Sequence, residues 1–214
     1  MNILFNANNA PIKLYRSPLS GHCHRVQLLL SLLELPYETI DLDMKNLAHK
    51  QPEYLKISPL GKVPAIDDNG FTLSDSNAIL VYLSKQYHNG YNWLPEEAKQ
   101  AAKVQYWLSV AAGEIAYGPC VVRLVKVFRF SLDYEVARKI TESVCAAIEA
   151  ALANQTFLAS ENVTLADIAC YSYISHMPEG GVSLKPYAAI RNWLTQIESL
   201  PHFVGMKRSA IPSS

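Results

Sequence analysis

The feature that most restricts the fold is a change in hydrophobic pattern close to residue 88. From Pro11 to about Tyr87, short apolar runs typical of strands alternate with longer helical ones. After HNGYNWLP (88–95), which carries Asn-Gly and a proline, almost every segment has a helical period. We therefore expect an α/β domain over 11–87, a linker over 88–95 and an all-helical domain over 96–210.

The first domain reads as β-α-β, a variable crossover, then a β-hairpin and a helix. The strands are expected at 12–15, 37–43, 63–66 and 71–73, and the helices at 25–35 and 74–87. DDNG joins the last two strands and is a turn signal of the Asn-Gly kind. A small mixed sheet with helices on both faces is the economical arrangement of these elements.

The second domain is expected to hold long alanine-rich helices and two shorter ones. The predicted ranges are 96–118, 132–155, 164–177 and 186–200, with kinks at Gly113 and Gly118-Pro119. Arg123, Lys126 and Arg129 follow one another at three-residue spacing, which predicts one solvated helix face.

Charge and composition argue against several classes of partner. Lysine and arginine total 19 and aspartate and glutamate total 19, so there is no electrostatic case for nucleic acid. The start, MNILFNANNA, lacks the basic region and long apolar run of a signal peptide, and no apolar run reaches the roughly 20 residues that span a bilayer. We therefore expect neither a leader nor a membrane segment.

Cysteine usage indicates a reducing compartment. Four cysteines lie far apart and form no Cys-x-x-Cys pair: Cys23, Cys120, Cys145 and Cys170. This pattern favours reduced thiols in a cytoplasm over a disulfide framework.

SPLSGHCHRV (17–26) is the segment richest in reactive side chains. His22 and His24 are two residues apart and would point different ways on a helix, which disfavours a metal site. Gly-x-Ser-x-Gly is absent, which argues against a hydrolase nucleophile. What remains is a hydroxyl or thiol between the first strand and the first helix, acting on a bound small molecule near the positive end of that helix.

Three further motifs have both a structural and a functional interpretation. Pro64 in VPAI marks either an edge strand or a bend with a cis Val63-Pro64 bond, whose exposed Val63 backbone could pair with an extended peptide. Asp75 and Ser76 open a helix, as a plain N-cap or as ligands for an ammonium and a carboxylate group. In TLADIA, Thr164 and Asp167 form a capping-box variant, for which folding is the expected role.

Together these motifs resemble one protein family over nearly the whole chain, from about Lys13 to Phe203. SPLSGHCHRV, AHKQPEYLKISPLGKVPAI, FTLSDSNAI and VTLADIA have the order and spacing of cytosolic glutathione S-transferases, most closely the serine-type phi and theta classes and similar bacterial enzymes. The resemblance implies a thioredoxin-like N-terminal domain, an all-helical C-terminal domain and a homodimer. It also implies a detoxification role with glutathione as co-substrate and no other cofactor.

The resemblance implies a role for each motif residue. Ser20 takes the place of the catalytic serine, and Asp75 replaces a Glu found in many members, which is expected to weaken glutathione binding. The remaining glutathione contacts are then His49, Lys50 and Lys62 at the glycyl carboxylate, Val63 and the cis proline Pro64 at the cysteinyl unit, and Asp75 with Ser76 at the γ-glutamyl end.

The magnitude of one hydrogen bond indicates what Ser20 can do. A free thiol of this kind has a pKa of about 8.5, so only a few per cent is thiolate at neutral pH. A hydrogen bond to a charged group contributes roughly 1.5–3 kcal/mol, which lowers the pKa by about one to two units. Ser20 is therefore expected to stabilise the glutathione thiolate, and not to act as a nucleophile.

The electrophile pocket is the least specified part of the site, and the family fold implies that it involves the helical domain. Tyr106, Val110, Gly113 and Tyr117 recur at helical spacing and could line that pocket or serve as ordinary core. The expected reaction is conjugation of glutathione to small hydrophobic electrophiles, or reduction of organic peroxides. The alternatives are a thiol-disulfide oxidoreductase working through Cys23 and a binding module that kept the fold without the chemistry.

Overall fold

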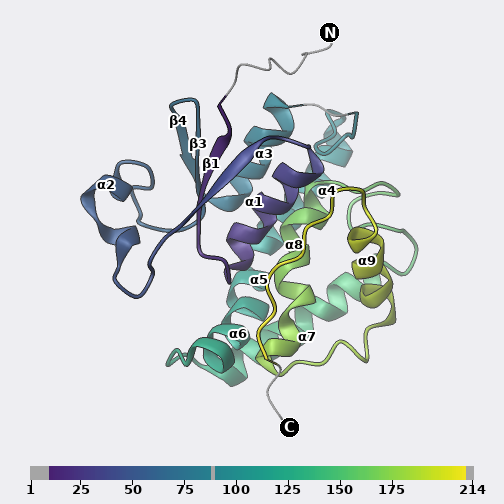
Figure 1. The fold of residues 1–214 in the computed structure, drawn as a ribbon. Helices are drawn as coiled ribbons and strands as arrows, with labels where there is room; N and C mark the ends of the chain where they lie inside the picture. The colour runs from purple at the N-terminus through teal and green to yellow at the C-terminus, as the bar shows by residue number, and fades with distance from the viewer. Residues whose placement is uncertain (1–9, 88–89, 211–214) are drawn as a thin grey trace. The chain divides into compact units, whose positions relative to one another are not determined.

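The protein forms two compact units in a computed structural model that describes residues 10–87 and 90–210 (Figure 1). Within these residues, unit 1 runs to Tyr91 and takes in Pro201–Met206, and unit 2 runs from Asn92 to Leu200 and resumes at Lys207. The expectation about a leader lies almost wholly outside the described residues, as do positions 88–89 of the predicted linker.

Unit 1 is built on a four-stranded mixed sheet in the order β2-β1-β3-β4. The central strand β1 runs parallel to β2, with Leu14 opposite Thr39, and antiparallel to β3, with Leu14 opposite Ile66. The elements are β1 (Ile12–Arg16), α1 (Gly21–Leu32), β2 (Tyr37–Asp41), η1 (Ala48–Lys50), α2 (Pro52–Leu55), β3 (Ala65–Asp68), β4 (Phe71–Ser74) and α3 (Ser76–Gln86).

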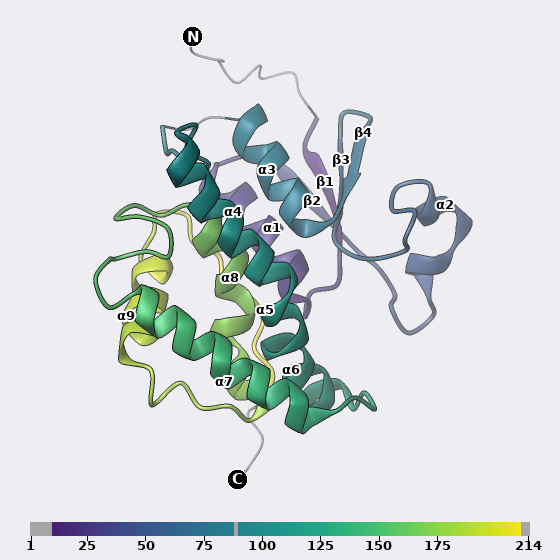
Figure 2. The same ribbon diagram turned by 180° about the vertical axis from the view of Figure 1, so that it is seen from behind.

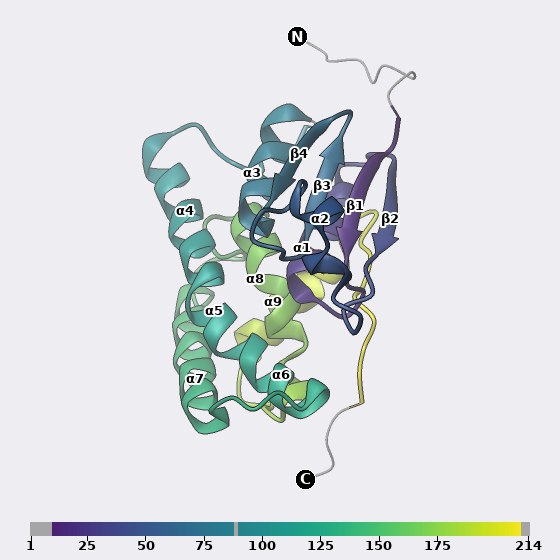
Figure 3. The ribbon, with the colours of Figure 1, turned by 90° about the vertical axis from the view of Figure 1, so that its left-hand side faces the viewer.

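Helices cover both faces of this sheet, as the alternation of strand and helix signals predicts. The helices α1 and α3 lie together on one face, and α2 with its flanking loops lies on the other (Figure 3). The layer between β1, β3 and the helices α1 and α3 is apolar and fully buried: Leu14, Val26, Leu29, Ile66, Ile79 and Leu80. This packing fixes the end of β1, from which the predicted active-site loop emerges.

Local turn chemistry accounts for the hairpin between β3 and β4. Asn69 and Gly70 have positive φ values of 52° and 92°, the conformation that the Asn-Gly pair predicts. The Asp67 carboxylate accepts the Gly70 N–H at 2.8 Å and closes the turn.

The C-terminal segment Pro201–Met206 belongs to unit 1 because it is bonded to α1. A ring nitrogen of His24 lies 2.9 Å from the Val204 carbonyl oxygen, and the Ser31 hydroxyl donates to the His202 carbonyl at 2.7 Å. Two residues of α1 therefore hold a stretch of chain some 170 positions later in the sequence.

Unit 2 is all-helical and is organised around α8 (Leu165–Ser175). All residues of α8 are buried, the polar Asp167, Ser172 and Ser175 included, and it contacts α4, α5, α6 and α9. Figure 2 shows α4, α5 and α6 following one another along the unit, with α7 beside them. The elements are α4 (Ala98–Ala112), α5 (Glu114–Tyr117), α6 (Pro119–Phe128), α7 (Tyr134–Ala151), α8, η2 (Met177–Gly180) and α9 (Ala188–Glu198).

The first long helix is broken where glycines were expected to kink it. Gly113 and Gly118 both leave helical geometry, with ψ values of −98° and −93°, and so separate α4, α5 and α6. A Cβ on Gly118 would lie 2.9 Å from the backbone nitrogen of Thr141, so a side chain there would push α7 away. The two glycines thus divide the predicted helix 96–118 into α4 and α5, and α6 (Pro119–Phe128) is a helix that the predicted ranges did not include.

The prediction of one solvated cationic face after this helix is wrong. Arg123 is only 2% exposed, and its Nε donates to Glu179 at 2.6 Å. Lys126 lies over the Tyr134 ring at 4.5 Å, and Arg129 has a φ of 62° at the end of α6. The sequence near Arg123 cannot reveal this buried ion pair, because Glu179 lies more than fifty residues away.

One segment does meet the length and composition of a membrane span, contrary to the expectation from the sequence. Taken together, Ala98–Phe128 is 31 residues long and apolar enough to cross a bilayer by length and composition. Half of its most apolar window is buried inside the protein, and the core helix of a soluble protein passes the same test of length and composition. The feature is therefore weak evidence for a membrane span.

Candidate active site

The predicted catalytic serine lies at the start of α1, just after the central strand. Ser20 is the N-cap of α1, and its Oγ accepts a long hydrogen bond of 3.4 Å from the Cys23 N–H. The helix therefore begins at Gly21, four residues before the predicted start, because the cap extends it through GHCH. Oγ lies at the positive end of a helix, where it can donate its own proton to an anion.

Cys23 lies in the interior and is a poor nucleophile. Its side chain is 1% exposed, and its Sγ accepts the Ser17 N–H at 3.4 Å. Burial raises the pKa of the Cys23 thiol to about 11, although the contacts with Ser17 and Ser20 oppose that rise. The thiol is therefore protonated at physiological pH, which argues against a redox role.

Ser76 lies in a polar cluster that joins α3 to α1. The Ser76 Oγ accepts from Arg25 Nη1 at 3.3 Å, and the same Nη1 donates to Asn77 Oδ1 at 2.9 Å. His22 Nδ1 lies 3.5 Å from the Ser76 Oγ. Burial, and then the positive charges of Arg25 and Lys62, lower the pKa of His22 to about 3. His22 is therefore neutral, and its Nδ1 can accept the Ser76 proton until a ligand takes its place.

Asp75 caps α3 in a strained conformation. Its φ of 78° is unusual for a residue with a Cβ, and its Oδ1 accepts from Asn77 N–H at 3.0 Å and Ala78 N–H at 2.9 Å. These two bonds confirm the N-cap interpretation. Among the residues that the structure describes, Oδ2 has no partner, so one oxygen of this exposed carboxylate remains for a ligand.

The loop before β3 has the bend that Pro64 predicts. The Val63-Pro64 peptide bond is cis, and the pairing of β3 with β1 and β4 starts only at Ala65. Among the described residues, neither the N–H nor the C=O of Val63 has a hydrogen-bond partner. An extended ligand could therefore pair with this backbone as an added strand does.

Two residues that sequence reasoning missed hold this loop in place. Tyr54 and Ser58 both donate to the Lys62 carbonyl, at 2.7 Å and 2.9 Å, and the Lys62 N–H returns a bond of 3.2 Å to Ser58. Burial raises the pKa of Tyr54, so its hydroxyl stays a donor. Their only signal in the sequence is a tyrosine shortly before the SPLGKVP motif and the serine with which that motif begins.

Lys50 and His49 lie beside the same loop on η1. The Lys50 ammonium donates to the carbonyls of Leu60 and Gly61 at 3.1 Å and 2.9 Å, which leaves one of its three protons. Gly61 has a φ of 56°, and a Cβ there would lie 2.6 Å from the His49 carbonyl oxygen. Burial, and then the charge of Lys50, lower the pKa of His49. His49 can therefore offer a ligand a hydrogen bond more readily than a charge.

These contacts bring most of the predicted residues of unit 1 into one cluster. His22 joins Ser76 to the α1 terminus that Ser20 caps and interacts electrostatically with Lys62, while Lys50 is bonded to Gly61. The sequence motifs assign no role to Arg25, and the structure makes it the donor that holds Ser76. The sequence signal that could have pointed to this role is the presence of a charged residue, Arg25, in a leucine-rich helix.

The predicted stripe of unit 2 does not form a single face. Val110 is buried at 8% exposure, whereas Tyr106 and Tyr117 are exposed. The break at Gly113 separates Tyr117 from the helix that carries the other two, so the spacing over eleven residues no longer aligns them. Val110 is core, and the two tyrosines remain candidates for the pocket.

The described residues contain no group of three or more His, Cys, Asp or Glu side chains that could hold an ion. The chemistry that the cluster can offer is hydrogen bonding and charge stabilisation of a bound anion.

The sequence matches two family models and many relatives along its length. Residues 10–85 match the glutathione S-transferase N-terminal domain, and residues 125–201 match the glutathione S-transferase C-terminal domain. Glutathione S-transferase 3 of Zea mays is 32% identical over 91% of this chain and 92% of its own. Disulfide-bond oxidoreductase YfcG of Escherichia coli is 30% identical over 89% of this chain and 91% of its own.

Solved structures agree with this assignment. A glutathione S-transferase from Pseudomonas fluorescens matches with a TM-score of 0.86 at 28% identity, over 92% of this chain and 99% of its own. The likeness therefore extends to both units of the fold.

Proposed function

Because the chain belongs to the glutathione S-transferase family, we propose that the cluster of unit 1 binds glutathione and that Ser20 holds its sulfur as a thiolate. The protein is a glutathione transferase, for which glutathione is the co-substrate and no other cofactor is required. The observation that carries the proposal is the position of Ser20 Oγ at the N-terminus of α1, the one end of a helix that favours an anion.

The reaction follows from what each group can donate. The Ser20 hydroxyl donates to the sulfur, which increases the thiolate fraction, and the thiolate then attacks the electrophilic carbon of a small hydrophobic substrate. The new bond is S–C, and the leaving group or the opened ring takes the electron pair. No side chain of the protein becomes covalently attached.

The other parts of glutathione contact the remaining residues of the cluster. The Val63 backbone pairs with the cysteinyl unit, and Lys50, Lys62 and His49 face the glycyl carboxylate. At the other end, Oδ2 of Asp75 receives the γ-glutamyl ammonium and the Ser76 hydroxyl donates to the α-carboxylate. In this proposal residues 11–87 form the glutathione-binding domain, 88–95 the linker and 96–210 the helical domain, with Tyr106 and Tyr117 lining the electrophile pocket.

Binding and conjugation test this function directly. Wild-type protein is expected to be retained on immobilised glutathione and to conjugate glutathione to a generic aryl halide. A protein that shows neither property would be a binding module or an enzyme of another class. Reduction of organic peroxides, a homodimeric state, a cytoplasmic location and a role in detoxification belong to the same proposal and follow from the family resemblance.

Replacing Ser76 by alanine is expected to weaken glutathione binding with little effect on turnover. A hydrogen bond to a carboxylate contributes roughly 1.5–3 kcal/mol, so KM for glutathione should rise about 10- to 150-fold while kcat changes little. Steady-state kinetics with varied glutathione measure this.

A serine on the same helix supplies the control for this variant. Ser84→Ala removes a hydroxyl whose one hydrogen bond among the described residues is to the Val81 carbonyl, so its KM should match that of the wild type. An unchanged KM in Ser76→Ala, or a loss confined to kcat, would remove Ser76 from the glutathione site.

Replacing Cys23 by alanine is expected to keep conjugation within a few-fold of the wild type. With a pKa of about 11, only about one thiol in a thousand is ionised at pH 8, and the side chain is buried. Iodoacetamide should therefore label this position slowly in the folded protein and rapidly after denaturation. Abolished activity in Cys23→Ala with activity kept in Ser20→Ala would instead favour the thiol-disulfide oxidoreductase.

A further inference from the structure

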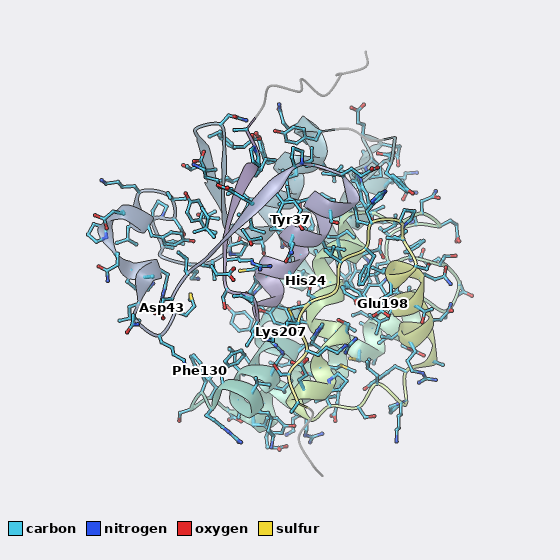
Figure 4. All side chains as sticks on the ribbon, in the orientation of Figure 1. His24, Tyr37, Asp43, Phe130, Glu198 and Lys207 are labelled. Carbon is cyan, nitrogen blue, oxygen red and sulfur yellow. The ribbon has the colours of Figure 1, made fainter. Side chains whose placement is uncertain are left out.

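Unit 2 contains a pocket of about 350 Å³ that shares no residue with the proposed glutathione site. It lies where the end of α8, the helix η2 and the helix α9 meet the C-terminal residues of the unit. Figure 4 labels Glu198 on α9 and Lys207 on the C-terminal segment, which identifies the region. The volume is at the lower end of the range for small-molecule sites.

The lining combines an apolar surface with hydroxyl groups. Pro178, Leu184 and Leu194 supply the apolar part, and Ser175 and Thr195 supply hydroxyls. Such a mixture suits a ligand with an apolar body and one polar end.

Two arginines contribute positive charge to this pocket. Arg191 is fixed in position because its Nη1 donates to the carbonyls of Leu184 and Lys185. Arg208 has no hydrogen bond or ion pair with any other residue that the structure describes. Burial lowers the pKa of His176 and the charge of Arg208 adds to that effect, while the same charge opposes the burial that raises the pKa of Tyr171.

The carboxylates of the pocket already have partners. Glu198 accepts the Tyr171 hydroxyl at 2.7 Å. Glu179 is buried, pairs with Arg123 at 2.6 Å and accepts the Ser209 N–H at 2.9 Å. With Arg123 included, cations outnumber carboxylates by one, and Arg208 is the cation without a partner.

We propose that this pocket binds a small carboxylic acid with an aromatic or short aliphatic body. The carboxylate lies on Arg208 beside the fixed guanidinium of Arg191, and the body lies on Leu184 and Leu194. A carboxylate matches the planar fork of an arginine, and a neutral analogue of the same shape forfeits that interaction. The Ser209 N–H is bonded to Glu179, which places Ser209 beside η2 in the lining of the pocket.

Calorimetric titration of the full chain with benzoate tests the proposal, with benzamide as the neutral probe. Benzoate is expected to bind with a stoichiometry of one per chain and at least about 10-fold more tightly than benzamide, from the strength of a charge-assisted hydrogen bond. Arg208→Gln should weaken benzoate by about 10- to 150-fold. Lys207→Gln is the matched control, because it removes the same charge one position away and outside the lining.

Further outcomes separate this pocket from the active site. S-hexylglutathione, which should occupy the glutathione site, is expected to leave benzoate binding unchanged. Displacement of benzoate by that compound would place the acid in the active site and overturn the proposal. Equal weakening in Arg208→Gln and Lys207→Gln, equal binding of benzamide, or no binding of benzoate would overturn it as well.

Discussion

Replacing Ser20 by alanine is expected to lower kcat/KM for conjugation by about 10- to 150-fold while glutathione binding is mostly kept. The loss corresponds to one hydrogen bond from the hydroxyl to the sulfur anion, roughly 1.5–3 kcal/mol. The same change should raise the pKa of the bound thiol by about one to two units. The alkaline shift of the pH profile of kcat/KM therefore provides a second readout, which a merely misfolded enzyme would not give.

Two further variants make this prediction specific. Ser17→Ala removes a hydroxyl from the same loop, and since Ser17 contacts Cys23 through its backbone N–H, activity should stay near that of the wild type. Ser20→Thr restores a hydroxyl and should recover part of the activity. Loss of the N-cap in Ser20→Ala also costs about 1 kcal/mol of stability, which thermal unfolding would register. Full activity in Ser20→Ala would overturn the proposed mechanism.

Replacing Asp167 by alanine is expected to cause the largest loss of stability, about 3–5 kcal/mol. The Asp167 carboxylate is fully buried and accepts from the N–H groups of Leu158 and Thr164, each at 2.8 Å, and from Trp193 Nε1 at 2.9 Å. The bond from the Thr164 N–H is the carboxylate half of the predicted capping box, and the Thr164 hydroxyl adds a further bond of 3.2 Å. Burial raises the pKa of Asp167 and these donors oppose that rise, so alanine would leave several buried donors without an acceptor.

Urea unfolding measures this difference against a simpler cap. Asp133 is the exposed N-cap of α7 and accepts from the Val136 N–H at 3.0 Å, so Asp133→Ala should cost about 1 kcal/mol. If Asp167→Ala does not yield folded protein, Asp167→Asn keeps one acceptor oxygen and should give an intermediate loss. Equal free energies of unfolding for the Asp133 and Asp167 variants would show that the buried network adds nothing beyond a cap.

The sequence was most informative where local chemistry decides the outcome. The Asn-Gly hairpin, the caps at Asp75 and Thr164 and the helix breaks at Gly113 and Gly118 each depend on residues within a few positions of one another. The α/β half, its mixed sheet and the helical half follow from periodicity, and family membership confirms that fold.

Contacts between distant segments were beyond prediction. Arg123 was expected in solvent because its own helix shows only a row of cations, and its buried partner Glu179 comes from η2. Arg25 and Tyr54 hold Ser76 and Lys62 through bonds that no local pattern announces. The motifs therefore predict which residues bind a ligand, and the structure was needed to show what holds those residues in position.

Because Pro201–Met206 packs with unit 1, the units of this protein cannot be exchanged with those of a relative at a single point in the chain. A chimera that exchanges the first 91 residues with a relative would separate α1 from its own partners, Val204 and His202, and set it against a foreign segment. Three junctions are needed, near residues 91, 200 and 206, to transplant the α/β unit whole, because the chain from Lys207 belongs to unit 2. The two units are successive in the sequence, yet neither is a module that a single cut can release.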